Sequence, residues 1–130
     1  MKRVVAALIL NENRILACQR TRHQAMPLKW EFPGGKIEEG EQPRAALRRE
    51  LEEELGIEAN IGNEVARIQH EYLTRGVIEL RFFEVRDYQG EIENRIFREI
   101  RWVGRKELLD LDFLEADLQL VKDLAAGKIL

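Results

Sequence analysis

The chain has 130 residues and a mass of 15.2 kDa, a size that holds one domain and excludes a multidomain protein. Its residues are 45% hydrophobic and 35% charged, which supplies apolar surface for a packed core and excludes a disordered chain. The formal net charge of −3 excludes a protein that attracts nucleic acid or an acidic membrane through bulk positive charge.

Cysteine usage and hydropathy indicate a compartment. The one cysteine, Cys18, cannot form an internal disulfide and lies in an apolar stretch, so we expect a small core residue in a reducing environment. No apolar run approaches the roughly 20 residues of a membrane span, and residues 1–14 turn polar too soon for a signal peptide. We therefore expect a cytoplasmic protein that binds a small molecule, with neither nucleic acid nor membrane as a partner.

The chain begins with two predicted strands. The apolar runs 4–10 and 14–20 flank the turn-prone triplet Asn11-Glu12-Asn13, a pattern that predicts an antiparallel hairpin. The polar residues 21–28 predict a loop, and Pro33-Gly34-Gly35 predicts a second loop that bends sharply.

The middle of the chain predicts a helix over 43–55, with Pro43 in its first turn and Gly56 at its end. Further strands are expected at 57–68, 76–86 and 96–103, a short helix at 105–109 and a longer helix at 116–126. This order of elements predicts one domain over residues 1–130, an α/β or α+β sandwich with a mixed sheet.

Three glutamates share one face of the predicted helix. At about 100° per residue, Glu50, Glu53 and Glu54 fall within an arc of roughly 100°. A separate apolar stripe beside them consists of Leu47, Leu51 and Leu55. Like charges held this close repel each other, and carboxylate oxygens are the ligands that Mg²⁺ or Mn²⁺ prefers. A solvated face with Arg48–Glu52 and Arg49–Glu53 ion pairs is the alternative, and helix geometry alone leaves both open.

Residues 35–57, GKIEEGEQPRAALRRELEEELGI, resemble the Nudix box, Gly-x5-Glu-x7-Arg-Glu-U-x-Glu-Glu-x-Gly-U, where U is aliphatic. Every specified position is matched: Gly35, Glu41, Arg49, Glu50, Leu51, Glu53, Glu54, Gly56 and Ile57. The residues WEFPGG in front of the box are similar to the MutT branch of this family. The resemblance implies a Nudix-type α/β/α sandwich, with the mixed sheet between helices.

The resemblance also implies an activity: hydrolysis of a nucleoside diphosphate linked to a group X, with Mg²⁺ or Mn²⁺ as cofactor. MutT-like members convert a nucleoside triphosphate, often an oxidised one such as 8-oxo-dGTP, to the monophosphate and pyrophosphate, which sanitises the nucleotide pool in support of DNA repair. By position, the implied catalytic residues are Arg49, Glu50, Glu53 and Glu54. The implied metal ligands are the last three and the carbonyl of Gly34, and Glu50 is the candidate general base.

One position departs from the MutT pattern. Members of this branch commonly carry a further glutamate six residues before the tryptophan that corresponds to Trp102, where it binds metal or acts as base. That position here is Ile96, and the two candidates to replace it are Glu99 and Glu93. Glu99 is therefore included among the candidate metal ligands, with an exposed strand residue as its alternative interpretation.

Candidate substrate contacts follow from the same resemblance. Arg20 aligns with a phosphate-binding arginine and Phe32 with a residue beside the nucleobase, while Asp117 stands where MutT has an asparagine that binds the oxidised purine. An ionised Asp accepts hydrogen bonds only, which suits the amino group of cytosine or a guanine edge, so cytidine and 8-oxo-guanine nucleotides both stay open. Asp117 also fits an N-cap of the last helix. Gly35 and Lys36, at the start of the box, complete the set of candidate substrate contacts.

Two other functions remain open from the sequence. One is hydrolysis of ADP-ribose, diadenosine or NADH substrates. The chain has no proline after Pro43 and no SQPWPFP-like segment, and the absence of these marks argues against the ADP-ribose and NADH types. The other is a non-catalytic Nudix module that senses nucleotides. The isoleucine at position 96 favours this alternative, and the intact box argues against it. A monomer and a homodimer are both compatible with the sequence.

Overall fold

The structure is a computed structural model that describes residues 1–74 and 76–130. Its strands are β1 (Lys2–Asn11), β2 (Arg14–Gln19), β3 (Trp30–Glu31), β4 (Gly34–Lys36), β5 (Glu58–Asn60), β6 (Glu64–Tyr72), β7 (Gly76–Val85), β8 (Asp87–Gln89) and β9 (Glu99–Gly104). Its helices are α1 (Pro43–Leu55), α2 (Leu118–Ala125) and the 3-10 turns η1 (Glu107–Asp110) and η2 (Glu115–Asp117).

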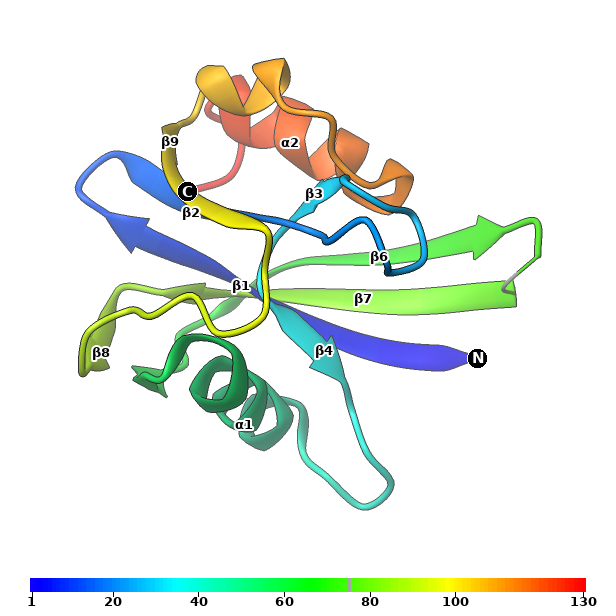
Figure 1. Cartoon of the computed structure of the whole chain (residues 1–130), viewed down its shortest axis with the longest axis horizontal. Coiled ribbons are helices and arrows are strands. Elements are labelled where there is room, and N and C mark those ends of the chain that lie inside the picture. The colour runs from blue at the N-terminus through cyan, green and yellow to red at the C-terminus, as the bar shows by residue number, and fades with distance from the viewer. Residues whose placement is uncertain (75) are drawn as a thin grey trace.

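A mixed sheet lies between α1 and α2, as the sequence predicts (Figure 1). The long strand β1 organises it: β1 runs parallel to β7 and antiparallel to β2 and β4. β6 continues the sheet beyond β7, while β3 and β9 both pair with β2. The predicted hairpin is confirmed, because Leu10 pairs with Ile15 across the turn at Glu12 and Asn13. β5 and β8 form a separate two-stranded sheet.

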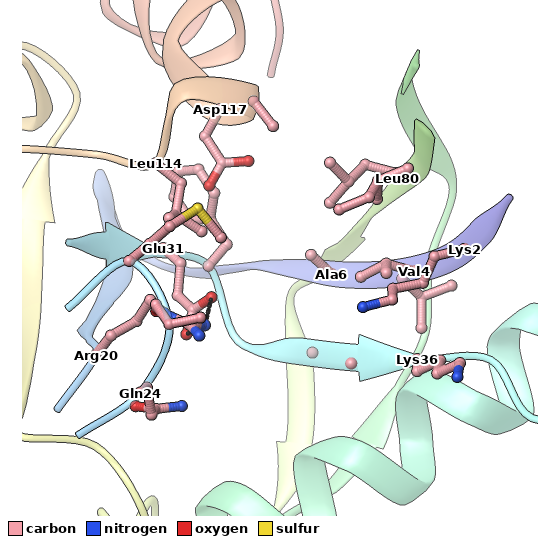
Figure 2. A pocket seen from close by; sticks show the side chains of 18 of the residues that line it. Lys2, Val4, Ala6, Arg20, Gln24, Glu31, Lys36, Leu80, Leu114 and Asp117 are labelled. Atoms are coloured by element: carbon pink, nitrogen blue, oxygen red, sulfur yellow. Dashed lines mark hydrogen bonds and ion pairs between the residues drawn. The ribbon is translucent and has the colours of Figure 1, made fainter. Parts of the chain in front are cut away.

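The prediction that Pro33-Gly34-Gly35 bends sharply is wrong for its two glycines. Residues 34–36 are the strand β4, which pairs with residues 4–6 of β1 (Figure 2). A Cβ atom on Gly34 would collide with the carbonyl oxygen of Val5 and lie 2.7 Å from the Cα of Ala6. Glycine therefore serves here to let two backbones approach closely rather than to turn the chain.

The predicted strand 57–68 is in fact two strands, β5 and β6. Residues 61–63 between them are not part of a strand. There the Gly62 N–H donates to the Glu84 carbonyl (2.8 Å), and the Glu84 N–H donates to the Asn63 carbonyl (2.9 Å). The strand predicted over 96–103 begins only at Glu99. Residues 91–98 instead cross the end of α1. The Glu93 N–H donates to the Leu55 carbonyl and the Arg95 N–H donates to the Glu54 carbonyl, which holds this segment against the helix. The sequence did not predict β3 or β8, which are too short to show a period.

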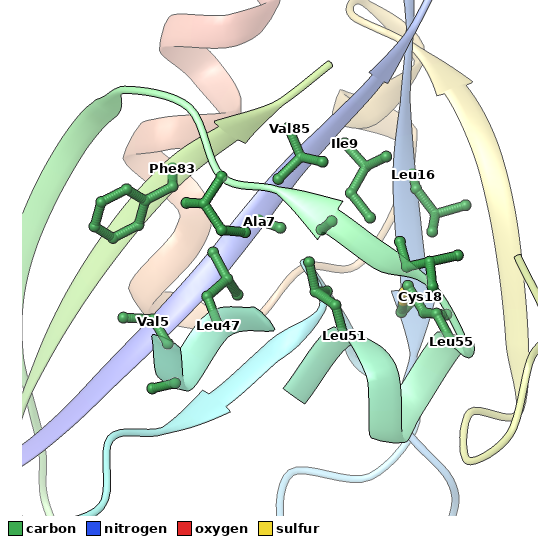
Figure 3. Close-up of a cluster of buried hydrophobic side chains, with 14 of the residues drawn as sticks. Val5, Ala7, Ile9, Leu16, Cys18, Leu47, Leu51, Leu55, Phe83 and Val85 are labelled. Atoms are coloured by element: carbon green, nitrogen blue, oxygen red, sulfur yellow. The ribbon is translucent and has the colours of Figure 1, made fainter. Parts of the chain in front are cut away.

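The helix α1 begins and ends where the sequence predicts. Pro43 occupies its first turn, and Gly56 ends it in the left-handed region (φ 71°), with its N–H donating to the Glu52 carbonyl. Its apolar stripe packs against one face of the sheet (Figure 3). The buried residues of that layer include Leu47, Leu51, Leu55, Val5, Ala7, Ile9, Phe83 and Cys18, so the prediction that Cys18 is a core residue is confirmed.

The carboxy-terminal segment covers the opposite face of the sheet, where Leu120, Val121 and Leu124 are buried. The helix predicted over 116–126 is split into the turn η2 and the helix α2, and the short helix predicted at 105–109 is the 3-10 turn η1. Within residues 1–74 and 76–130, neither helix has the length and apolar surface to cross a membrane.

Candidate active site

A cavity of about 310 Å³ opens on the α2 side of the sheet, beside β4 (Figure 2). Strands β1, β4 and β7 form its floor, and the loop after β2, the end of β6 and the turn η2 form its walls. Figure 2 shows Asp117 and Leu114 at one end and Lys36 at the other. We call these the Asp117 end, whose walls are Phe32, Leu114, Tyr72, Met26 and Asp117, and the glutamate end, whose walls are Gly34, Gly35, Lys36 and Glu54.

The glutamate end takes its acidic groups from one face of α1, which packs against β4. Glu54 is only 9% exposed, because the apolar stripe of α1 draws this face of the helix onto the sheet. Burial, the neighbouring Glu50 carboxylate and Glu31 together raise the pKa of Glu54 to about 9. Burial also raises the pKa of Glu50, whose carboxyl group is in hydrogen-bonding contact with Glu54.

Two glycines let these carboxyl groups approach β4. The Gly34 N–H donates to Oε1 of Glu54 at 3.1 Å, so the strand backbone itself orients that carboxyl group. A Cβ atom on Gly35 would lie 2.5 Å from Oε2 and 2.6 Å from Oε1 of Glu50. The first glycine of the predicted box is therefore required because a glutamate of the same box lies against its Cα.

Arg49 joins the loop before α1 to the helix. Its guanidinium donates to both carboxylate oxygens of Glu41 (2.8 and 2.9 Å), to Oε1 of Glu50 (2.9 Å) and to the carbonyl of Lys36 (3.1 Å). This pairing lowers the pKa of Glu41 to about 2 and also opposes the effect of burial on Glu50. Arg49 thereby fixes the Glu50 carboxylate on α1 and holds Glu41, the one glutamate of the box pattern that precedes α1.

Glu53 lies apart from the other two glutamates. Its side chain is 59% exposed, and Oε2 lies 3.6 Å from Nη1 of Arg49, so the predicted pair of residues four apart is present. Among residues 1–74 and 76–130, no three histidine, cysteine, aspartate or glutamate side chains converge as ligands on one point. The residues present nevertheless fit a hard divalent cation: two touching carboxyl groups, a third on the same helix face and the backbone of Gly34 beside them.

The residues considered for the missing glutamate lie in different places. Ile96 lines the cavity beside Glu54 and is 46% exposed, so the isoleucine stands at the site itself. Glu99 begins β9, where its carboxylate pairs with Arg101 (2.7 Å), and Glu93 pairs with Arg95 (3.7 Å). Neither Glu99 nor Glu93 is part of the cavity wall.

Asp117 closes the far end of the cavity and is 3% exposed. Burial, with a smaller effect of Glu31, raises its pKa to about 8, so the side chain is mostly protonated at neutral pH. Asp117 occupies the N-cap position of α2, but its side chain makes no capping hydrogen bond. The carboxyl group is directed into the cavity instead (Figure 2).

Arg20 and Glu31 lie between the two ends. Nη1 of Arg20 donates to Oε1 and Oε2 of Glu31 (3.1 and 3.3 Å), and Nε of Arg20 donates to the carbonyl of Ala25 (2.8 Å). Phe32, next along the chain, is buried and packs against Phe113 with ring centroids 5.0 Å apart. Both residues predicted for substrate contact therefore line the cavity, together with Gly35 and Lys36.

Sequence reasoning missed several residues of this site, among them Glu31, Met26 and Tyr72. Glu31 stands in the WEFPGG segment, and that proximity was the only signal available for it. Met26 in a loop and Tyr72 at a strand end carry no periodic pattern, because their place in the wall depends on how distant segments pack.

The fold and the glutamate end together define a class of protein. The NUDIX domain model matches residues 1–124 of this chain, so the chain belongs to that family.

Particular relatives are similar over nearly the whole length. The CTP pyrophosphohydrolase of Escherichia coli (strain K12) is 39% identical over 126 residues, covering 97% of this chain and 93% of the relative. The 8-oxo-dGTP diphosphatase of Haemophilus influenzae is 39% identical over 122 residues, covering 93% and 89%. The solution structure of the E. coli ORF135 protein superimposes with a TM-score of 0.86 at 37% identity, covering 98% of this chain and 91% of the other.

Proposed function

We propose that the protein hydrolyses a nucleoside triphosphate to the monophosphate and pyrophosphate, with Mg²⁺ as cofactor and Mn²⁺ as its substitute. The observation that carries the proposal is the pair of touching carboxyl groups, Glu50 and Glu54, of which Glu54 lines one end of a cavity whose other end is mostly apolar, with Asp117 and Tyr72 as its polar groups. A nucleotide has the same polarity, with an anionic phosphate chain at one end and a flat, hydrogen-bonding base at the other. The relatives named for CTP and 8-oxo-dGTP support a triphosphate as substrate.

The glutamate end suits a polyphosphate only with a cation present, because ionised Glu50 and Glu54 would repel it. Glu50, Glu53, Glu54 and the carbonyl of Gly34 are the proposed ligands: Glu54 lines the cavity, and Glu50 and Glu53 lie on the same helix face. Glu99 is left out because its carboxylate lies on β9, paired with Arg101. A divalent cation there supplies neutralisation of the phosphate charge and polarisation of the attacked phosphoryl group. Carboxylate and carbonyl oxygens are the hard donors that such a cation prefers, and a bound cation would favour the ionised form of Glu50 and Glu54 over the protonated form that burial favours.

The chain's own residues have the remaining roles. Glu50, oriented by Arg49, accepts the proton of the attacking water as general base. Arg20, held by Glu31 and the Ala25 carbonyl, and Lys36, on the cavity rim, contact phosphate oxygens. Lys36 is supported in this role by its place on β4 beside the glycines.

The Asp117 end receives the nucleobase. Phe32 and Leu114 give it apolar walls, and the protonated Asp117 offers one donor and one acceptor at neutral pH. A carboxylic acid in this form presents the same pair of groups as an amide side chain. This widens the range of base edges beyond those that an ionised Asp would accept, and it suits both cytosine and 8-oxo-guanine.

The experiment is pyrophosphate release with Mg²⁺ from a panel of dGTP, 8-oxo-dGTP, dCTP and CTP. We expect turnover of at least one, abolished by chelation of the cation, and a loss of most turnover in Glu53→Gln with the fold intact. Glu52→Gln, on the exposed side of the same helix, is the matched control and should keep full turnover. Tight nucleotide binding without hydrolysis would instead identify a sensor module, and near-normal activity of Glu53→Gln would remove that residue from the metal site.

A further inference from the structure

A thin partition separates the cavity from a second hollow. Met26, Tyr72 and Leu114 line both the cavity and a neighbouring hollow of about 420 Å³. Among residues 1–74 and 76–130, these three residues are the wall that the two spaces share at the Asp117 end. The other residues around the hollow are Lys29, Asp112, Phe113, Glu115 and Leu118, of which Lys29 and Asp112 form an ion pair (2.8 Å).

Two members of the partition are anchored. The hydroxyl of Tyr72 accepts a hydrogen bond from the Ala116 N–H (3.4 Å), and its ring meets His70 edge-on with centroids 4.5 Å apart. The backbone of Leu114 is fixed on both sides, since its N–H donates to the Trp30 carbonyl and its carbonyl accepts from the Asp117 N–H (both 2.9 Å). The Tyr72 side chain therefore cannot leave the wall without breaking its contacts, and the backbone that carries the Leu114 side chain is fixed.

Met26 is held in place by its backbone instead. Its φ is 50°, in the left-handed region, although it is not glycine and it precedes Pro27. The conformation is fixed from both sides: Nε of Arg20 donates to the Ala25 carbonyl (2.8 Å), and Nε2 of Gln19 donates to the Leu28 carbonyl (3.1 Å). Strain that neighbouring contacts maintain in this way is concentrated at functional sites.

We propose that Met26 determines how large a base the enzyme accepts, by closing the Asp117 end against the hollow behind it. This rests on the proposed function, which puts the base at that end. Met26 is the one member of the partition whose side chain is unbranched and has no hydrogen-bonding anchor, so shortening it joins the two spaces while Tyr72 and Leu114 stay in place. The joined space would take nucleoside triphosphates that carry a bulky apolar group on the base, against Phe113 and Leu118.

The test compares CTP and 8-oxo-dGTP with their analogues that carry a benzyl group on the exocyclic amine. For each variant, the kcat/KM of the benzyl analogue is divided by that of the unmodified nucleotide. We expect Met26→Ala to raise this ratio at least tenfold over the parent protein, and Met26→Leu, which keeps the bulk, to leave it within about twofold. Met26→Gly accepts the same φ without strain and should raise the ratio in the same way, so the test survives poor folding of the alanine variant.

Leu28→Ala is the matched control. Leu28 lies in the same loop, also has a left-handed φ (63°), and belongs to neither cavity wall as the structure describes them. It should keep the parent ratio. The proposal is overturned if Met26→Ala and Met26→Gly keep the parent ratio, or if Leu28→Ala raises it equally.

Dissociation constants of the same four nucleotides, measured by calorimetry with Mg²⁺, separate the two levels of inference. Absence of hydrolysis in the parent protein would contradict the proposed function, whereas the ratio of dissociation constants in Met26→Ala still decides the role of Met26. A tenfold gain in relative affinity for the benzyl analogue supports that role, and an unchanged ratio overturns it.

Discussion

The two ends of the cavity are built in different ways. The glutamate end comes from β4 and α1, consecutive elements, and Arg49 ties the intervening loop to the helix. The Asp117 end is assembled from the loop after β2, the end of β6 and the turn η2, which are far apart in the chain. Reactive chemistry is thus held in one local unit, while the end assigned to the base can vary through separate loops on the same scaffold.

Both ends bury a carboxyl group whose pKa is raised, but the neighbours differ. Glu54 has a second carboxyl group, Glu50, in contact with it, whereas the charge that raises the pKa of Asp117, beside burial, is that of Glu31. A divalent cation relieves the first arrangement, because it attracts both ionised groups. In the second arrangement, protonation alone removes the buried charge of Asp117. Asp117 then serves as a hydrogen-bonding group rather than as a metal ligand.

The largest effect is expected from Glu54→Gln, which removes a proposed ligand without changing its shape. We expect kcat to fall on the order of 10²–10³-fold, the range found when a group that stabilises developing charge is lost. Because the glutamine adds no charge to a buried site, the thermal midpoint should stay the same or rise. Pyrophosphate release and thermal unfolding measure both quantities, with Glu52→Gln as control. Full activity of Glu54→Gln would contradict the proposal that a cation binds at the glutamate end.

Gly35→Ala tests whether the local unit depends on the close approach of Glu50. The new Cβ would lie 2.5 Å from Oε2 of Glu50, so the carboxylate must move and activity should fall about 10- to 100-fold. Gly40→Ala is the control: no atom lies within 4 Å of its Cβ, but its φ of 79° disfavours a side chain. It should cost about 1 kcal/mol in urea unfolding and keep the parent activity. Equal activity losses in the two variants would contradict the role of Glu50.

Asp117 tests the other end. We expect Asp117→Asn to keep the parent kcat/KM at pH 7, since an amide also offers a donor group and an acceptor group there, and Asp117→Ala to lose about tenfold or more. Above pH 8 the parent should lose activity relative to Asp117→Asn, because its carboxyl group ionises. Glu115→Gln, on the same turn but exposed, should follow the parent at every pH. A parent and an Asn variant with parallel pH profiles would contradict a protonated Asp117.

The smallest effect is on stability. The folded pKa values, about 9 for Glu54 and about 8 for Asp117, lie above the ordinary values of 4.5 and 3.8. Both groups therefore favour the folded state at acid pH, and the free energy of unfolding should fall by a few kcal/mol between about pH 4 and pH 9. Urea unfolding should show that Mg²⁺ removes the part of this slope due to Glu54 and leaves the part that Asp117→Asn removes. If Mg²⁺ leaves the pH dependence of the free energy of unfolding unchanged, Glu54 is not a ligand of the cation.

Several features could be predicted because they depend on neighbours in sequence. The bounds of α1 follow from Pro43 and Gly56, and the spacing of Leu47, Leu51 and Leu55 predicts which face is buried. A helix has a fixed period, so the shared face of the three glutamates follows as well. The intact box, read as a resemblance, gave the family that the comparison with known domains then showed.

Other features were decided only by packing between distant segments. Gly34 and Gly35 are strand residues because β1 lies against them, and Glu54 is buried while Glu53 is 59% exposed because β4 covers only part of one helix face. Met26 and Tyr72 share a wall that no sequence period connects. The sequence by itself determined the helix and the order of its charged groups, since both are local. The tertiary structure decided which of those charges are buried, because desolvation depends on what the rest of the chain brings against them.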